Sequence, residues 1–286
     1  MELTVLGAGV TTPSRTRFGS SHLLSIGGGA LLFDCGPATT YRLARAGVSL
    51  STIDQLFFTH HHYDHDADFG CFVLCRWDHG AGQERPLHVF GPTRTATISE
   101  RLFGKAGVFE FDLSARLNHP ASLRTYQNRG GVLPRRPPAL EVVDATPGTV
   151  CSGVDWVVTA AHAQHAQPWL DSLAYRVDSS EGSVVFTGDT EPCRSVVELA
   201  RGADMMVCMC QDDEDVMKAK GVDAGSTGPA GAARMASEAG VRKLVLVHIG
   251  PGLEGQGPMQ KAIESARSFF GGEVIFSEEL LRIPVR

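Results

Sequence analysis

A row of histidines and aspartates follows directly on an apolar run near residue 58. The run is Leu56–Phe58, and residues 59–66 read Thr-His-His-His-Tyr-Asp-His-Asp. Runs that are apolar on both faces are typical of strands buried beneath helices. The row therefore falls on a loop at the end of a buried strand, which is where α/β proteins place reactive groups.

The residue types in this row indicate a metal site. Neutral imidazoles and carboxylates bind Zn²⁺ at about 2.0–2.2 Å, and four of them are costly to bury on one loop without a cation. His60 and His62 are two residues apart and can converge on one metal, while Asp64 and His65 indicate a second site beside it. Two divalent cations about 3.5–4 Å apart would form a hydrolytic centre. The alternative is a surface histidine cluster without fixed geometry.

A centre with two metals needs further ligands from other strand ends, and the chain offers three candidates. By itself, an aspartate at such a place could instead cap a helix or a turn, and a histidine could bond to the backbone. Beside the histidine row, we interpret them as metal ligands. They are Asp189 after Val184–Phe186, His248 after Leu244–Val247, and His162 or His165 after Val157–Ala161.

Short apolar runs alternate with helical patterns along the whole chain, which predicts an α/β fold. The helical patterns cover residues 39–46, 193–200, 229–239 and 260–269. Two halves, about 1–148 and 149–286, each mix strands and helices, and no long linker separates them. We therefore expect a single domain over residues 1–286.

Residues 101–137 differ in composition from the rest of the chain. They carry seven basic and two acidic residues, a local charge of +5 in a chain whose net charge is −6. A solvated surface loop would explain this segment, and so would a basic insertion that contacts an acidic substrate or partner.

Composition and charge disfavour several classes of protein. A net charge of −6 disfavours a nucleic-acid binder that uses its whole surface. No apolar run approaches the roughly 20 residues of a membrane span, and the first residues lack the basic and apolar regions of a signal peptide. Seven cysteines at irregular spacings are typical of a reduced chain. We therefore expect a cytoplasmic protein without a membrane partner.

Taken together, these motifs resemble the metallo-β-lactamase superfamily. The resemblance rests on the histidine row, on Gly188-Asp189-Thr190 and on Val247-His248, and it extends to Leu6–Gly9 and to the stretch Leu32-Phe33-Asp34-Cys35-Gly36. Within the superfamily, the chain is most similar to the branch of ribonuclease Z, phosphodiesterases and arylsulfatase-like enzymes. The resemblance implies an αββα sandwich of two mixed sheets flanked by helices.

The resemblance also implies a set of metal ligands. The family places one histidine a few residues before a Tyr-Arg strand, here Tyr175-Arg176, so we expect His165 rather than His162 as that ligand. Asp64 and Asp189 are the expected catalytic residues, with Asp64 helping to orient a metal-bound hydroxide. The expected ligands are His60, His62 and His165 for the first metal, Asp64, His65 and His248 for the second, and Asp189 as the bridge.

Two departures from ribonuclease Z weaken the assignment of tRNA processing. Gly225, in Gly225-Ser226-Thr227, stands where ribonuclease Z has a histidine that assists catalysis. The arm rich in glycine, proline and lysine that grips tRNA is not evident, although residues 101–137 could be a divergent substitute. Neither departure weakens the metal centre.

We therefore favour a hydrolase with two zinc ions per chain, which cleaves an ester, lactone, sulfate or phosphodiester bond of a small molecule with a metal-bound hydroxide. Mn²⁺ and Fe fit similar ligands. A ribonuclease Z-like phosphodiesterase is the main alternative, so nucleic acid is a possible but less favoured substrate. A mononuclear iron dioxygenase and a non-catalytic metal protein stay open as further alternatives. The resemblance also implies a homodimer.

Overall fold

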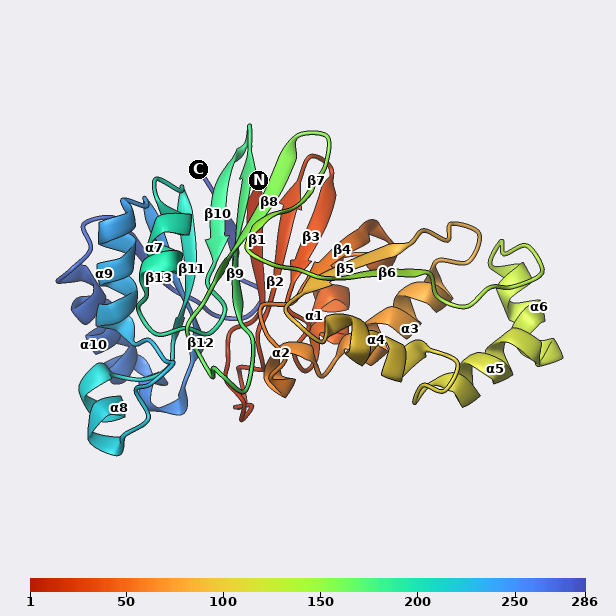
Figure 1. Ribbon diagram of the computed structural model, residues 1–286, viewed down its shortest axis with the longest axis horizontal. Coiled ribbons are helices and arrows are strands. Elements are labelled where there is room, and N and C mark those ends of the chain that lie inside the picture. The colour runs from red at the N-terminus through yellow and green to blue at the C-terminus, as the bar shows by residue number, and fades with distance from the viewer.

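Two packed seven-stranded β-sheets form the centre of the protein, with helices on both outer faces (Figure 1). The computed structural model describes residues 1–286. In neighbour order, the first sheet consists of β14 (Arg282–Pro284), β1 (Glu2–Gly7), β2 (Ser21–Ile26), β3 (Gly29–Phe33), β4 (Ile53–Phe57), β5 (Leu87–Gly91) and β6 (Leu140–Asp144). The second sheet consists of β13 (Glu273–Phe276), β12 (Lys243–Ile249), β11 (Met205–Cys210), β10 (Gly182–Phe186), β9 (Leu173–Ser179), β8 (Trp156–His162) and β7 (Gly148–Ser152).

Both sheets are mixed. Strands β3 to β6 are parallel to one another, as are β10 to β13, and the other neighbours are antiparallel. The chain passes from the first sheet to the second between Asp144 and Gly148, and β14 returns to the first sheet beside β1. With the helices described next, this architecture confirms the predicted αββα sandwich.

Each sheet has its own layer of helices. The outer face of the first sheet is covered by α1 (Thr39–Arg45), α3 (Phe69–His79) and α4 (Thr95–Phe103), and that of the second by α7 (Arg194–Ala200), α9 (Pro229–Ala239) and α10 (Gln256–Arg267). Two further short helices, α2 (Tyr63–Asp66) and α8 (Glu214–Lys220), and the 3₁₀ turns Leu50–Thr52 and Pro251–Leu253 lie in connecting segments. None of the helices combines the length and the apolar character needed to cross a membrane.

The strand period of two divides the apolar residues between separate cores. Phe33 and Phe57 point between the sheets, where Phe33 stacks on Phe57 and on Phe186 with ring centroids 4.9 and 4.0 Å apart. Their neighbours Leu32 and Leu56 point outward, into the core beneath α1 and α3. The continuous apolar runs in the sequence arise because these strands are buried on both faces.

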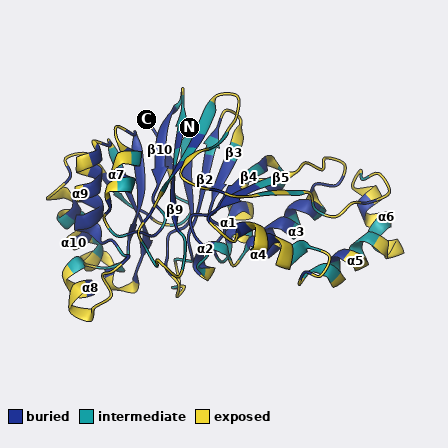
Figure 2. Ribbon diagram, viewed as in Figure 1, coloured by how far each residue is buried: buried dark blue, intermediate teal, exposed yellow.

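Residues 101–137 form a helical arm rather than only a loop. Helices α5 (Glu110–Asn118) and α6 (Pro120–Asn128) project beyond α4 at one end of the molecule and are largely exposed (Figures 1 and 2). Pro120 is the first residue of α6, and the Nδ1 of His119 accepts a hydrogen bond from the N–H of Ala121. Proline at this position favours a helix start, so α5 and α6 are separate helices joined at a sharp turn.

Three of the basic residues in this segment attach the arm to the body of the protein. Arg116, Arg129 and Arg135 pair with the carboxylate of Asp78 at 3.4, 2.6 and 2.8 Å. Arg135 is buried, and its guanidinium stacks 3.8 Å from the ring of Trp77. These three cations therefore stabilise the fold, and Arg135 is not available to a ligand at the surface.

Candidate metal centre

The histidine row follows β4 and turns into α2. His60 is buried and His62 is half-buried, and α2 carries the buried side chains of Asp64 and His65. The N–H of His65 donates to the carbonyl of His62 at 2.9 Å, and the N–H of Cys35 donates to the carbonyl of His65 at 2.7 Å. These hydrogen bonds hold the turn against the end of β3.

Three segments of the second sheet bring further side chains to the same place. Asp189 follows β10, and His165 lies in the segment that joins β8 to β9. His248 lies in β12 at a β-bulge, where the register against β11 shifts and the φ angle of His248 is +51°. Bulges turn side chains away from the regular alternation of a strand, and they are frequent beside active sites.

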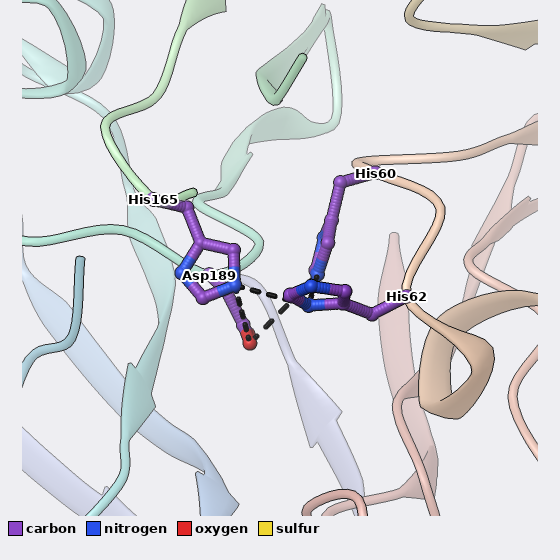
Figure 3. Close-up of side chains that lie close together, drawn as sticks. All are labelled: His60, His62, His165 and Asp189. Atoms are coloured by element: carbon purple, nitrogen blue, oxygen red, sulfur yellow. Dashed lines mark hydrogen bonds and ion pairs between the residues drawn. The ribbon is translucent and has the colours of Figure 1, made fainter. Parts of the chain in front are cut away.

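These side chains converge as two groups, and within each group the ligand atoms lie within 4.8 Å of one another. The members of the first group point toward one another from opposite sides, as Figure 3 shows. The first group is His60, His62, His165 and Asp189, and the second is Asp64, His65 and His248.

The distances between the side chains fit shared cations. His62 Nδ1 lies 3.1 Å from His165 Nε2, and His248 Nε2 lies 3.1 Å from Asp64 Oδ2. Asp189 stands between the groups, because its Oδ2 lies 3.8 Å from His165 Nε2 and 3.1 Å from His248 Nε2. Two ligands that are each about 2.1 Å from a tetrahedral cation lie about 3.4 Å apart.

Hydrogen bonds behind the imidazole rings determine which nitrogen faces the cluster. The Nδ1–H of His165 donates to the carbonyl oxygen of Gly225 at 2.7 Å, and a carbonyl can only accept. The Nδ1–H of His60 donates to Thr59 Oγ1 at 3.1 Å. Both rings therefore carry a free lone pair on Nε2, which is directed at the cluster.

Asp34 is a further residue of the site, which the sequence analysis did not assign to it. Its Oδ2 accepts from the Nδ1–H of His65 at 2.8 Å and from the hydroxyl of Thr59 at 2.9 Å, and its Oδ1 accepts from the N–H of Thr59 at 2.7 Å. Asp34 is buried directly after β3, with a φ angle of +58° that aspartate tolerates better than most residues. A lone aspartate after a buried strand was the available signal.

Burial and neighbouring charges shift the pKa values of the cluster. Burial lowers the pKa of His60 well below its usual value, and His65 adds to this effect. Burial alone would raise the pKa of Asp189, but His248 and His65 outweigh burial and hold that pKa well below its usual range. At neutral pH, His60 is therefore neutral and Asp189 is ionised, the forms in which these two residues bind metals. Burial lowers the pKa of His65, but Asp189 and Asp34 outweigh burial and hold that pKa well above its usual value, so His65 would release a proton on binding a metal.

Several buried polar atoms of the cluster have no hydrogen-bond partner, namely Asp64 Oδ1, His65 Nε2 and Asp189 Oδ1. An unpaired buried polar atom costs about 1–3 kcal/mol, and a charged one costs more. A divalent cation among these atoms would satisfy them together. The nitrogen and oxygen donors suit zinc, manganese or iron, so the residues present fit the expected group.

Two nearby histidines, His162 and His61, lie outside the cluster. The side chain of His162 is 60% exposed, and its Nδ1 lies 3.6 Å from Asp171. His61 is held by Asp66 at 3.2 Å and by the hydroxyl of Thr95 at 2.8 Å. The structure thus brings His165 rather than His162 to the other predicted ligands. Metal binding by these residues stays a prediction.

The backbone at Gly225 leaves no room for the histidine of ribonuclease Z. The φ angle of Gly225 is +71°, and a Cβ there would lie 2.1 Å from the carbonyl oxygen of His165. The carbonyl of Gly225 instead orients the ring of His165, and its N–H donates to Glu191 Oε2 at 2.9 Å. This position therefore holds a candidate ligand in place and does not supply a proton.

One cavity lies at the amino ends of β5 and β6 in the first sheet. It has a volume of about 380 Å³ and lies between α3, the start of β5 and the arm, with Trp77, Tyr126 and Arg136 among its lining residues. The histidine row follows the carboxyl end of β4, which is parallel to β5. The cavity is therefore separate from the candidate metal centre.

Comparison with known families decides the assignment. A family described as "Beta-lactamase superfamily domain" matches residues 30–249, a range that contains every member of the two ligand groups. The chain belongs to the metallo-β-lactamase superfamily. This confirms the prediction of a metal-dependent hydrolase that acts on an ester-type bond.

Solved structures agree with this fold. The metallo-beta-lactamase fold protein YhfI from Bacillus subtilis is similar over 99% of this chain and 98% of its own, with a TM-score of 0.73 and 23% identity. The short form of human tRNase Z covers 100% of both chains, with a TM-score of 0.66 and 21% identity.

Curated relatives correct one prediction. Ribonuclease Z of Mycolicibacterium gilvum is 32% identical over 292 residues, which cover 100% of this chain and 96% of that protein. Ribonuclease Z of Mycobacterium marinum is also 32% identical, over 100% of this chain and 99% of its own length. The prediction that favoured a small-molecule substrate over nucleic acid is wrong, because these full-length relatives are ribonucleases by name. Net charge misled the prediction, since it averages over a surface on which cations can be concentrated locally.

Proposed function

We propose that the protein is a ribonuclease Z-like phosphodiesterase that cleaves RNA with two zinc ions. The observation that carries the proposal is the convergence of seven histidine and aspartate side chains in two adjoining groups. The 32% identity to full-length relatives named ribonuclease Z supports RNA as the substrate class.

Each part of the cluster has a role in this proposal. Divalent cations bound there would act as Lewis acids on the phosphoryl group and activate water for the attack. Asp34 and Gly225 hold the rings of His65 and His165 in the orientation that binding requires. Asp64, whose Oδ1 has no partner, would help to orient the attacking water. The proposed ligands are His60, His62 and His165 for one ion, Asp64, His65 and His248 for the other, and Asp189 for both.

The arm offers cations for the phosphate backbone of such a substrate. Of the seven basic residues between 101 and 137, the three that bind Asp78 are used internally. The other four are exposed and form no ion pair with the chain: Arg101, Lys105, Arg124 and Arg136. Exposed cations of this kind give affinity for nucleic acid that falls as salt rises.

The test is cleavage of a transfer-RNA transcript that carries a single-stranded 3′ extension. We expect two zinc ions per chain by elemental mass spectrometry, and cleavage that stops on chelation and returns when zinc is added. His60→Ala should lose zinc and cleavage, whereas His88→Ala should keep both, because His88 is a half-buried histidine on β5 that pairs with Glu141 away from the cluster. A protein with two zinc ions that leaves the RNA intact would contradict the proposal.

A second readout addresses the arm. Replacing Arg124 and Arg136 by glutamine should weaken RNA binding. The slope of log affinity against log salt should fall by about 0.7–0.9 for each phosphate that the variant no longer neutralises. An unchanged slope would remove the arm from the RNA interface but would leave the hydrolytic centre in place.

A further inference from the structure

An almost fully exposed tryptophan lies beside the candidate metal centre. Trp169 is 90% exposed, in the segment that joins β8 to β9 and that also carries His165. Tryptophan offers a large apolar ring surface, which folded proteins usually bury in large part. Neither the fold nor the seven-residue cluster makes use of this ring.

The segment that carries Trp169 is held in place by hydrogen bonds. The N–H of Trp169 donates to the carbonyl of Ala166 at 3.0 Å, and the side chain of Gln167 bridges the N–H of His165 and the carbonyl of Ala163 at 2.8 and 2.9 Å. A turn of four residues brings its first and last Cα atoms within about 7 Å, so Trp169 lies within about 11 Å of His165. A structured turn therefore holds the Cα of Trp169 within about 11 Å of the Cα of His165.

A free cation lies on the neighbouring loop. Asp171, two residues after Trp169, accepts hydrogen bonds from the N–H and the hydroxyl of Thr93 at 3.2 and 2.9 Å, and these bonds tie the two loops together. Arg94, next to Thr93, is exposed, and its guanidinium forms no ion pair with the chain. Two acidic groups face these loops. Asp171 is engaged by Thr93 and lies 3.6 Å from the ring of His162. The carboxylate of Asp144 accepts from the backbone N–H groups of Arg94 and Ala96 at 3.2 and 2.8 Å.

We propose that Trp169 and Arg94 form a nucleotide-binding platform beside the metal centre. A base that flanks the scissile phosphodiester stacks on the indole, and the phosphate of that nucleotide pairs with the guanidinium. This proposal rests on the proposed function, because it takes the substrate to be RNA. Every base has a π-face, so such a platform binds single-stranded RNA with little preference for sequence.

The surroundings of Trp169 favour a base over a protein partner. Its neighbours Gln167 and Pro168 are exposed and Leu170 is half-buried, and other strongly exposed apolar side chains lie on separate segments, such as Phe111 at 84% on the arm and Val154 at 107% between β7 and β8. Protein docking sites are usually continuous apolar patches, whereas one exposed ring with one cation matches a single nucleotide.

Tryptophan fluorescence of the zinc-loaded protein tests the platform directly. The chain has three tryptophans, so Trp169→Phe and Trp156→Phe are matched variants. Adenosine 5′-monophosphate should quench the wild type and Trp156→Phe but leave Trp169→Phe unchanged. Ribose 5-phosphate, which lacks a base, should quench none of them. Quenching by the nucleotide that survives in Trp169→Phe would overturn the proposal.

Kinetics on the transfer-RNA transcript separate this proposal from the proposed function. Trp169→Ala should raise KM about 5- to 150-fold, the range expected for loss of one stacked base, with kcat and zinc content unchanged. Arg94→Gln should raise KM and lower its dependence on salt. Cleavage by Trp169→Ala with the KM of the wild type would overturn the platform alone, whereas failure of the zinc-loaded wild type to cleave RNA would overturn both proposals. Loss of self-association in Trp169→Ala, with RNA binding unchanged, would overturn the platform in favour of a protein contact.

Discussion

Replacing Asp34 by asparagine tests whether the hydrogen bonds behind the rings control the metal centre. Asparagine has the size of aspartate, and its Oδ1 can still accept from the N–H of Thr59. Its Nδ2, however, is a donor and would face two other donors, the Nδ1–H of His65 and the hydroxyl of Thr59. The ring of His65 must then turn or change its tautomer, and either change removes the Nε2 lone pair from the cluster.

The expected effect is a selective loss of metal affinity. Changes in the partners of a metal-binding histidine cost about 10- to 100-fold in affinity, which is about 1.4–2.7 kcal/mol. The loss should fall on the ion assigned to Asp64, His65 and His248, because Asp34 bonds directly to His65. The other ion should be affected less, since His165 is oriented by Gly225 instead.

Competition with a chromogenic chelator measures the two zinc affinities in one titration. Asp68→Asn is the matched control, because Asp68 is a half-buried carboxylate that accepts from the N–H of Thr40 at 2.6 Å and contacts none of the clustered histidines. Circular dichroism would establish that both variants are folded. If Asp34→Asn binds both ions as tightly as the wild type, the reasoning about ring orientation is refuted.

Three further outcomes can be measured on single variants. His165→Ala should lose one of two zinc ions by elemental analysis and His162→Ala should keep both; the reverse pattern would mean that the third ligand is misassigned. Gly225→Ala should displace His165, because its Cβ would lie 2.1 Å from the carbonyl oxygen of that residue, and we expect lower zinc content and a loss of more than about 1 kcal/mol in urea unfolding. Asp78→Asn should loosen the arm and speed its limited proteolysis, with a loss of about 1–3 kcal/mol. Burial alone would raise the pKa of Asp78, but its arginine partners hold the pKa below the usual value. The ionised Asp78 carboxylate therefore stabilises the fold above the unfolded-state pKa of about 3.9, and this stabilisation is lost as pH falls through the lower folded-state pKa. The difference in the free energy of unfolding between the wild type and Asp78→Asn should accordingly disappear in acid.

Features that depend on neighbours in the chain could be predicted from the sequence. The apolar runs are the strands of the two sheets, because burial on both faces leaves a local apolar pattern. His60, His62, Asp64 and His65 lie within six residues on one turn, so their spacing alone indicated a common site. The αββα sandwich was predicted correctly because these local motifs resemble those of the metallo-β-lactamase superfamily.

Other features depend on segments that meet only in the folded protein. His165 joins the cluster, and its ring is held by the carbonyl of Gly225, 60 residues away in the chain, whereas His162 on the same stretch points elsewhere. Asp34 reaches His65 across two strand ends, and Arg135 turns inward to Asp78 while other cations of its segment stay exposed. Local spacing determined which chemistry this chain can perform. Only the tertiary structure decided which side chains are oriented, buried or free, because long-range hydrogen bonds and burial have no local pattern in the sequence.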